Sequence, residues 1–166
     1  LGAFREEADP DRNWLALNTN PRQVQGSLKE VLAGADVFIG VSAGNILDGD
    51  DIATMADDAV VFALANPTPE VDPGVAGDHA AVVATGRSDY PNQINNVLAF
   101  PGLFRGMLDV RAGEVTDQML VVAANAIAAA VEPAELNSAF IIPGVFTPDL
   151  AEKVAGAIRE EFANGQ

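Results

Sequence analysis

Three short apolar segments at similar intervals constrain the fold of this chain more than any other feature. They are Asp36–Val41 (DVFIGV), Val60–Leu64 (VVFAL) and Ala81–Thr85 (AVVAT). Each is continuously apolar instead of alternating with polar residues, which is typical of strands buried on both faces. A predicted helical turn or two over Asp50–Ala56 separates the first two segments. This order predicts a parallel sheet whose strands are joined by crossover helices.

Outside the sheet, the sequence predicts several helices and one further strand. The polar opening, Leu1–Pro21, is interpreted as a loop-rich entry held to the body by Trp14 and Leu17. In Asn92–Asp109, Pro101 predicts a kink or a break, because proline cannot continue a helix normally. A helix is predicted over Ser27–Ala33, with Ser27 as its cap and Gly34 as its stop. Two further helices are predicted over Thr116–Val131, with Thr116 as the cap, and over Pro148–Phe162. A last short strand is predicted over Phe140–Pro143.

The three apolar segments are followed by residues suited to loops. These residues read Ser-Ala-Gly, Asn-Pro-Thr-Pro and Gly-Arg-Ser-Asp. In open α/β sheets, ligands bind outside the carboxyl ends of the strands. We therefore expect the functional site at these three loops.

The net charge of the chain limits the kinds of partner that it can bind. Twenty-four acidic and nine basic residues give a net charge of −15. Phosphate backbones require cationic contacts, so we expect no nucleic-acid partner. Acid-rich, lysine-poor surfaces stay hydrated in concentrated salt, where repulsion between like charges is screened. We hypothesise a halophilic source, with an acidic protein of ordinary salt tolerance as the alternative.

Hydropathy and cysteine content bear on location. The longest apolar runs are too short to span a membrane, so we expect no membrane partner. The chain has no cysteine, which excludes disulfides and thiolate metal sites. This composition agrees with a cytoplasmic location.

Three ordered motifs carry a resemblance to a known family. Phe62–Glu70 reads FALANPTPE, and Ala84–Gly102 reads ATGRSDYPNQINNVLAFPG. Both closely resemble bacterial and archaeal malic enzymes, and Val37–Ser42 (VFIGVS) is similar to the strand and loop that precede them. The resemblance is dense from about Asp36 to Asp109. It departs after Ser-Ala, where the family commonly has proline and this chain has Gly44.

The resemblance implies an oxidoreductase that oxidatively decarboxylates malate to pyruvate and carbon dioxide. Its implied cofactors are NAD or NADP and a divalent metal, Mg or Mn, which polarises the malate oxygens as a Lewis acid. By similarity, Ser42, Ala43 and Gly44 form the turn beside the dinucleotide. Asn66 lies beside the nicotinamide and the substrate, and Asn95 and Asn96 face malate. An amide side chain suits this role because it offers two donors and an acceptor in one plane.

Each asparagine also has a purely structural interpretation. Asn66 precedes a proline and could simply open a turn. Asn95 and Asn96 could cap the helix that begins nearby.

Other polar residues favour structural roles. A salt bridge between Arg87 and Asp89 is as good an interpretation as anion binding, and Tyr90 is expected to pack. Asp50 and Asp51 resemble a metal pair but begin a helix, where acidic residues complement the dipole.

The chain lacks parts that such an enzyme requires. It contains no Gly-x-Gly-x-x-Gly turn, which normally takes the pyrophosphate in a dinucleotide site. The family's catalytic lysine, tyrosine and carboxylate metal ligands belong to an N-terminal part, so we expect no catalytic residue and no metal ligand within this sequence. The predicted fold is an α/β, Rossmann-like doubly wound parallel sheet with flanking helices, incomplete at its first strand–helix unit. Residues 1–166 are interpreted as one partial NAD(P)-binding domain.

The expected partners are malate and pyruvate, the absent N-terminal catalytic domain and further copies of the same chain in a homo-oligomer. The isolated fragment is expected to be inactive. Two alternatives remain at this stage: the cofactor domain of an amino-acid dehydrogenase, and a non-catalytic nucleotide-sensing or assembly module with the same fold.

Overall fold

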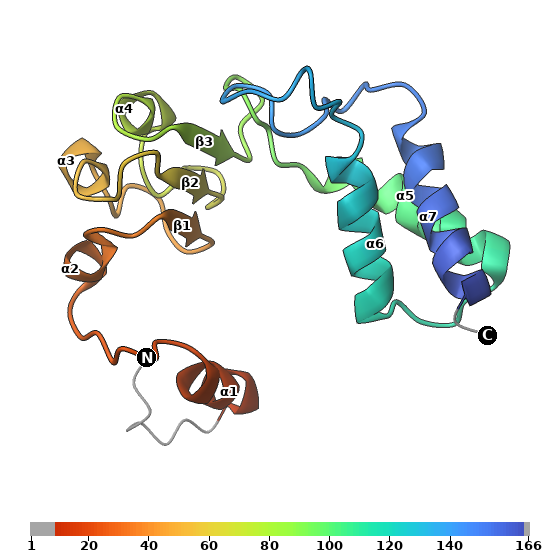
Figure 1. Ribbon diagram of the computed structural model, residues 1–166, viewed down its shortest axis with the longest axis horizontal. Coiled ribbons are helices and arrows are strands. Elements are labelled where there is room, and N and C mark those ends of the chain that lie inside the picture. The colour runs from red at the N-terminus through yellow and green to blue at the C-terminus, as the bar shows by residue number, and fades with distance from the viewer. Residues whose placement is uncertain (1–8, 165–166) are drawn as a thin grey trace.

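The computed structural model describes residues 9–164 and contains a three-stranded parallel sheet (Figure 1). Its strands are β1 (Val37–Gly40), β2 (Val60–Ala63) and β3 (Val82–Thr85), adjacent in chain order. They pair without a shift at their carboxyl ends, where Gly40 lies opposite Ala63 and Ala63 opposite Thr85. The three predicted strands and their parallel arrangement are confirmed.

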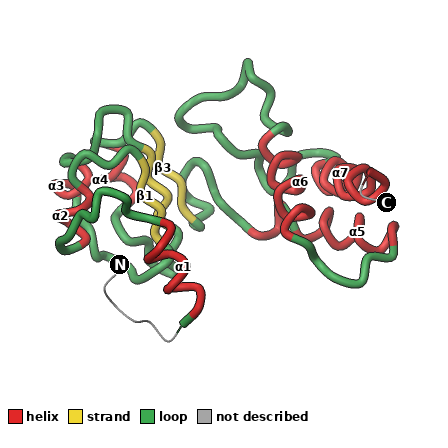
Figure 2. Tube along the Cα trace, turned by 60° about the horizontal axis from the view of Figure 1, so that its bottom comes forward, coloured by secondary structure: helices red, strands yellow, loops and turns green. Residues whose placement is uncertain are grey.

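Helices α2 (Leu28–Leu32), α3 (Gly49–Ile52) and α4 (Pro73–Gly77) lie on one side of this sheet (Figure 2). Each begins at a side chain that accepts a backbone N–H. Ser27 and Glu30 form a capping box on α2, Asp48 does the same with Asp51 on α3, and Asp72 caps α4. The predicted helix stop at Gly34 is also present, with φ of +72°.

The other face of β1 is open in the part of the chain that the structure describes. Phe38 is buried, whereas Val37 and Ile39 expose 52% and 62% of their surface. The expectation of burial on both faces is therefore wrong for β1 within residues 9–164. The sequence could not reveal this, because an apolar run reads the same whether or not its second face is covered.

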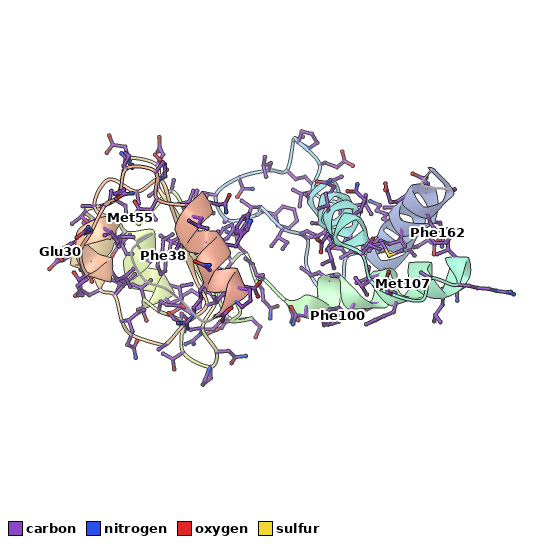
Figure 3. The ribbon with its side chains drawn as sticks, turned by 90° about the horizontal axis from the view of Figure 1, so that it is seen from below. Glu30, Phe38, Met55, Phe100, Met107 and Phe162 are labelled. Carbon is purple, nitrogen blue, oxygen red and sulfur yellow. The ribbon has the colours of Figure 1, made fainter. Side chains whose placement is uncertain are left out.

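A second group of helices follows the sheet. It comprises the 3₁₀-helix η1 (Asn96–Leu98), α5 (Phe100–Val110), α6 (Asp117–Ala128) and α7 (Leu150–Asn164). Figure 3 shows Phe38 and Met55 among the residues of the sheet unit, and Met107 and Phe162 between helices of the second unit. These side chains belong to two separate apolar cores. None of the helices within residues 9–164 is long and apolar enough to cross a membrane.

The predicted elements of the helical unit are confirmed only in part. The helical segment is broken just before Pro101, because η1 ends at Leu98 and α5 begins at Phe100. Pro101 occupies the first turn of α5, where the backbone N–H that proline lacks would have no partner within the helix. Phe140–Pro143 forms no strand; a single bridge joins Phe140 to Asn137. Thr116 caps α6 as predicted, and α7 begins at Leu150, two residues later than expected.

The opening of the chain also differs from its interpretation as a loop. Pro10–Asn18 forms helix α1, with Asp9 as its cap and proline in its first turn. Trp14 and Leu17 expose 61% and 69% of their surface, so they do not pin this segment to the body. Residues 1–8 lie outside the described part of the chain.

Two glycines set the distance between α5 and α7. A Cβ added at Gly102 would lie 2.5 Å from Cβ of Val154, and one at Gly106 would lie 2.6 Å from Cβ of Ile158. Both partner side chains are fully buried. The spacing of four places both glycines on one face of α5, where they allow close helix contact.

We expect Gly106→Ala to lower the free energy of unfolding by about 1–3 kcal/mol, because the added methyl overpacks the contact with Ile158. Gly77→Ala is the matched control in α4, since its Cβ would meet nothing within 4 Å. The control should be neutral or stabilising by up to about 1 kcal/mol. Urea unfolding of both variants measures the difference, and equal stabilities would contradict the role assigned to Gly106.

Candidate functional site

The loops after the three strands leave the same edge of the sheet. Residues 42–45 follow β1, residues 65–70 follow β2 and residues 86–95 follow β3. Because the strands are parallel and end in register, the three loops start side by side. This is the position at which open α/β sheets bind ligands.

The first two loops are hydrogen-bonded to each other. The N–H of Asn45 donates to the carbonyl of Pro69 at 2.9 Å, and the N–H of Leu47 donates to the carbonyl of Glu70 at 3.0 Å. Gly44 lies so close to Thr68 that an added Cβ would stand 2.6 Å from the threonine Cβ. Glycine is therefore required at position 44 by the approach of the second loop.

Glu70 is fully buried between these loops, with 0% of its surface exposed. Its Oε1 accepts the N–H of Ser42 at 2.8 Å, and its Oε2 accepts the N–H of Ala65 at 3.0 Å. Burial acts to raise the pKa of Glu70, but these backbone N–H donors outweigh it and hold the pKa below the usual glutamate value. The group is thus an ionised carboxylate at neutral pH.

The third loop is anchored at Thr85, the buried last residue of β3. The carbonyl of Thr85 accepts the N–H of Ile94 at 2.8 Å, which carries Asn95 and Asn96 back towards the sheet edge. The side chain of Asn95 accepts the N–H of Val97 at 3.0 Å and so caps η1. Its capping interpretation is confirmed.

Asn66 and Asn96 differ from Asn95 in this respect. Both are exposed, and within residues 9–164 their side chains make no hydrogen bond to the protein. No hydrogen bond joins either one to the Ser42–Gly44 turn in the same part of the chain. Two amides at the sheet edge are thus left available for a ligand.

Asn92 was missed by the sequence reasoning. Its Nδ2 donates to the carbonyls of Val83 and Ser138 at 3.0 and 2.8 Å, and its Oδ1 accepts the N–H of Ile141 at 2.9 Å. The side chain is 6% exposed and the backbone φ is +56°. Asn92 joins the sheet to the segment before α7. Its place after Pro91 in a turn is the only sequence signal for this role, since asparagine tolerates positive φ.

Three residues weighed as functional have structural partners. Arg87 Nε donates to Asp89 Oδ1 at 2.9 Å, and its guanidinium lies 5.2 Å from the centroid of the Tyr90 ring. Hydrogen bonding to Asp89 raises the pKa of Arg87. Asp51 belongs to the capping box of α3 and pairs with Lys29 at 2.5 Å.

The turn after β1 offers unused backbone donors. Ser42 and Asn45 use their N–H groups on Glu70 and Pro69, but within the described residues those of Ala43 and Gly44 donate to no protein acceptor. Within residues 9–164, these two adjacent N–H groups and the amide of Asn66 are available to donate to ligand oxygens.

Metal binding has no comparable support here. Among residues 9–164, no group of three or more histidine, cysteine, aspartate or glutamate side chains is arranged to hold a metal ion. A small cleft of about 200 Å³ lies between α4, β3 and Tyr90. Its walls include Tyr90, Pro91 and Asn92 of the third loop but contain neither the Ser42–Gly44 turn nor Asn66, so it does not include the first two loops.

Comparison with known proteins gives consistent matches. Residues 12–162 match the family described as "Malic enzyme, NAD binding domain". The chain is 54% identical over 158 residues to the NAD-dependent malic enzyme of Geobacillus stearothermophilus, covering 94% of this chain and 33% of that protein. It is 44% identical over 125 residues to the NADP-dependent malic enzyme of Halomonas elongata, covering 74% of this chain and 29% of that one.

A solved structure extends this likeness to the fold. The malic enzyme from Pyrococcus horikoshii superposes with a TM-score of 0.87 at 46% identity, covering 94% of this chain and 36% of the other. The α/β fold with a parallel sheet and flanking helices is thereby confirmed. The chain spans about a third of the length of these relatives.

We expect Glu70→Gln to flatten the acid limb of the stability curve. Because the folded pKa of Glu70 lies below its unfolded value, its contribution is full above about pH 4.3 and is lost as pH falls through the folded pKa. The wild-type unfolding free energy should fall faster below that pH, by at most about 1.4 kcal/mol per pH unit. Urea unfolding between pH 6 and pH 3 tests this, and parallel curves would contradict it.

Proposed function

The chain belongs to the malic enzyme family, and we propose that the protein containing it oxidatively decarboxylates malate to pyruvate and carbon dioxide while reducing NAD or NADP. The observation that carries the proposal is the match of residues 12–162 to the family's NAD-binding domain. The free amides at the sheet edge give it a chemical basis. Residues 1–166 are then a single partial cofactor domain of a larger cytoplasmic enzyme.

The three loops divide the binding work in this proposal. Bound NAD or NADP supplies the hydride acceptor. The Ser42–Ala43–Gly44 turn lies against the dinucleotide, where the N–H groups of Ala43 and Gly44, unused within residues 9–164, donate to its oxygens. Asn66 orients the nicotinamide carboxamide beside the substrate, and Asn96 holds malate through its unpaired amide.

Asn95 has a more limited part. It belongs to the proposed malate site by similarity, yet its side-chain oxygen already caps η1. Its Nδ2 makes no hydrogen bond within residues 9–164 and is available to donate to a malate carboxylate. From the resemblance to malic enzymes, we assign the catalytic lysine and tyrosine, and the ligands of a divalent Mg or Mn ion, mainly to the remaining two-thirds of the protein.

The test is a spectrophotometric assay of the full-length protein in molar salt, with malate, a divalent metal, and NAD or NADP in separate reactions. Nicotinamide reduction with stoichiometric pyruvate supports the proposal and identifies the cofactor. If a folded protein reduces neither cofactor, the fold serves nucleotide sensing or assembly instead. The homo-oligomeric state stays a prediction, checked by light scattering in the same buffer.

Asn96→Ala should weaken the use of malate by about 1–3 kcal/mol in kcat/KM, roughly tenfold or more, because a malate oxygen loses its partner. Asn13→Ala is the control. Asn13 is an exposed asparagine on α1, far in sequence from the three loops of the site. Steady-state kinetics with both variants measure the effect. Unchanged malate kinetics in Asn96→Ala would remove this residue from the site.

The charge of the chain supports adaptation to salt as part of the proposal. Ion pairs engage Lys29, Arg87, Arg105 and Arg159, but nine basic residues are too few to neutralise 24 acidic ones. Adjacent exposed pairs such as Asp57 and Asp58 repel each other in dilute buffer. Molar salt reduces the screening length to about 3 Å and removes this repulsion.

The melting temperature should accordingly rise by at least about 4 °C between dilute buffer and molar KCl, on the order of 1 kcal/mol for a domain of this size. A calorimetric scan at several KCl concentrations measures the change. A melting temperature that stays constant would contradict the halophilic interpretation without bearing on the enzymatic one.

A further inference from the structure

Glu70 connects two loops that leave different strands. Oε1 accepts the N–H of Ser42 at 2.8 Å and its hydroxyl at 3.3 Å, whereas Oε2 accepts the N–H of Ala65 at 3.0 Å. Each carboxylate oxygen thus serves one loop. Because the side chain is fully buried, these bonds are shielded from competing water.

The main chain of Glu70 holds the other end of the same turn. Its carbonyl accepts the N–H of Leu47 at 3.0 Å, while its side chain holds Ser42. Residues 42–47 are therefore fastened at both ends to one residue of the second loop. The N–H groups of Ala43 and Gly44 lie between these two fastening points and are unused within residues 9–164.

The carboxylate lies against the end of β1. A Cβ added at Gly40, the last residue of β1, would lie 2.5 Å from Cδ of Glu70. The strand end and the side chain are thus in direct contact, and glycine makes room for the carboxylate. Ionisation is favoured as well, since backbone donors lower the pKa of Glu70 despite its burial.

We propose that Glu70 is a positioning residue for the nicotinamide cofactor, whose buried carboxylate fixes the Ser42–Gly44 turn in the shape that presents two backbone N–H groups. This inference rests on the proposed function and deepens it. Glu70 touches no reacting atom; it acts through the turn.

A glutamine at position 70 separates this role from simple packing. Glutamine has nearly the same volume, but it offers one oxygen and one NH₂ group where the two loops present two N–H donors. One of the bonds to Ser42 and Ala65 must therefore be replaced by a donor–donor contact. The turn then loses one of its two attachments while the core stays filled.

The experiment compares the full-length wild type with Glu70→Gln and with Asp72→Ala. Asp72 caps α4 through the N–H groups of Gly74 and Val75 and makes no hydrogen bond to Ser42 or Ala65. Its replacement lowers stability close to Glu70 in sequence without releasing the turn. For each protein the measurements are thermal unfolding, hydrogen exchange of residues 42–47, and the Kd values of reduced NAD, reduced NADP and malate.

We expect Glu70→Gln to weaken binding of the preferred reduced cofactor by about tenfold, an order of magnitude typical of a lost charged hydrogen bond. Exchange at residues 42–47 should accelerate, and the malate Kd should stay within about twofold. Asp72→Ala should lose thermal stability and keep the cofactor Kd of the wild type.

Two contrary outcomes are distinguishable. If the wild type binds cofactor and Glu70→Gln binds it equally well despite lower stability, Glu70 is only structural and this inference is overturned while the proposed function stands. If the folded wild type binds neither reduced cofactor, the proposed function is overturned, and this inference with it.

Discussion

The parallel pairing of β1, β2 and β3 in register is the constraint on which the candidate site depends. Gly40, Ala63 and Thr85 stand opposite one another at the carboxyl end of the sheet. A shift of one residue in any strand would turn its buried side chains to the opposite face. Phe38, Val61 and Val83 pair with one another on the core-facing side of the sheet and therefore fix the level at which each loop begins. Hydrophobic burial in the sheet thus determines where the three loops begin, and so where their polar groups lie.

The polar contacts above this edge then divide into two kinds. Glu70 and Asn92 are buried and fully engaged, one between the first two loops and the other between the sheet and residues 138–141. Figure 1 shows that only loop segments connect the sheet unit to α5, α6 and α7. Because each unit has its own apolar core, the bonds of Asn92 are well placed to couple them.

The sequence was sufficient for elements determined by local patterns. Continuous apolar runs identified the strands, and Ser27, Thr116 and Gly34 identified helix ends, because caps act within one turn. Elements determined by distant partners were missed. Phe140–Pro143 has the composition of a strand, but Asn92, 49 positions from Ile141, binds this segment as a loop. The exposure of Val37 and Ile39 was equally hidden, since it depends on what covers the sheet.

The site residues show the same division between local and distant causes. Motif resemblance pointed to Asn66, Asn95 and Asn96 alike, because a sequence does not show which side chains already have a hydrogen-bond partner. The structure makes them unequal: the η1 cap engages the oxygen of Asn95, whereas Asn66 and Asn96 keep their amides free within residues 9–164.

Glu70 ends the FALANPTPE motif, but its role could not be read from the sequence, where it resembles any surface glutamate that follows a proline. A buried carboxylate is costly unless several donors surround it. Its donors come from Ser42 and Ala65, and Ser42 becomes a neighbour only after β1 and β2 have paired. The carboxylate therefore has both donors only when the two strands are paired. The pairing of β1 and β2 therefore determines the shape of the Ser42–Gly44 turn, because it brings Ser42 to the buried carboxylate of Glu70.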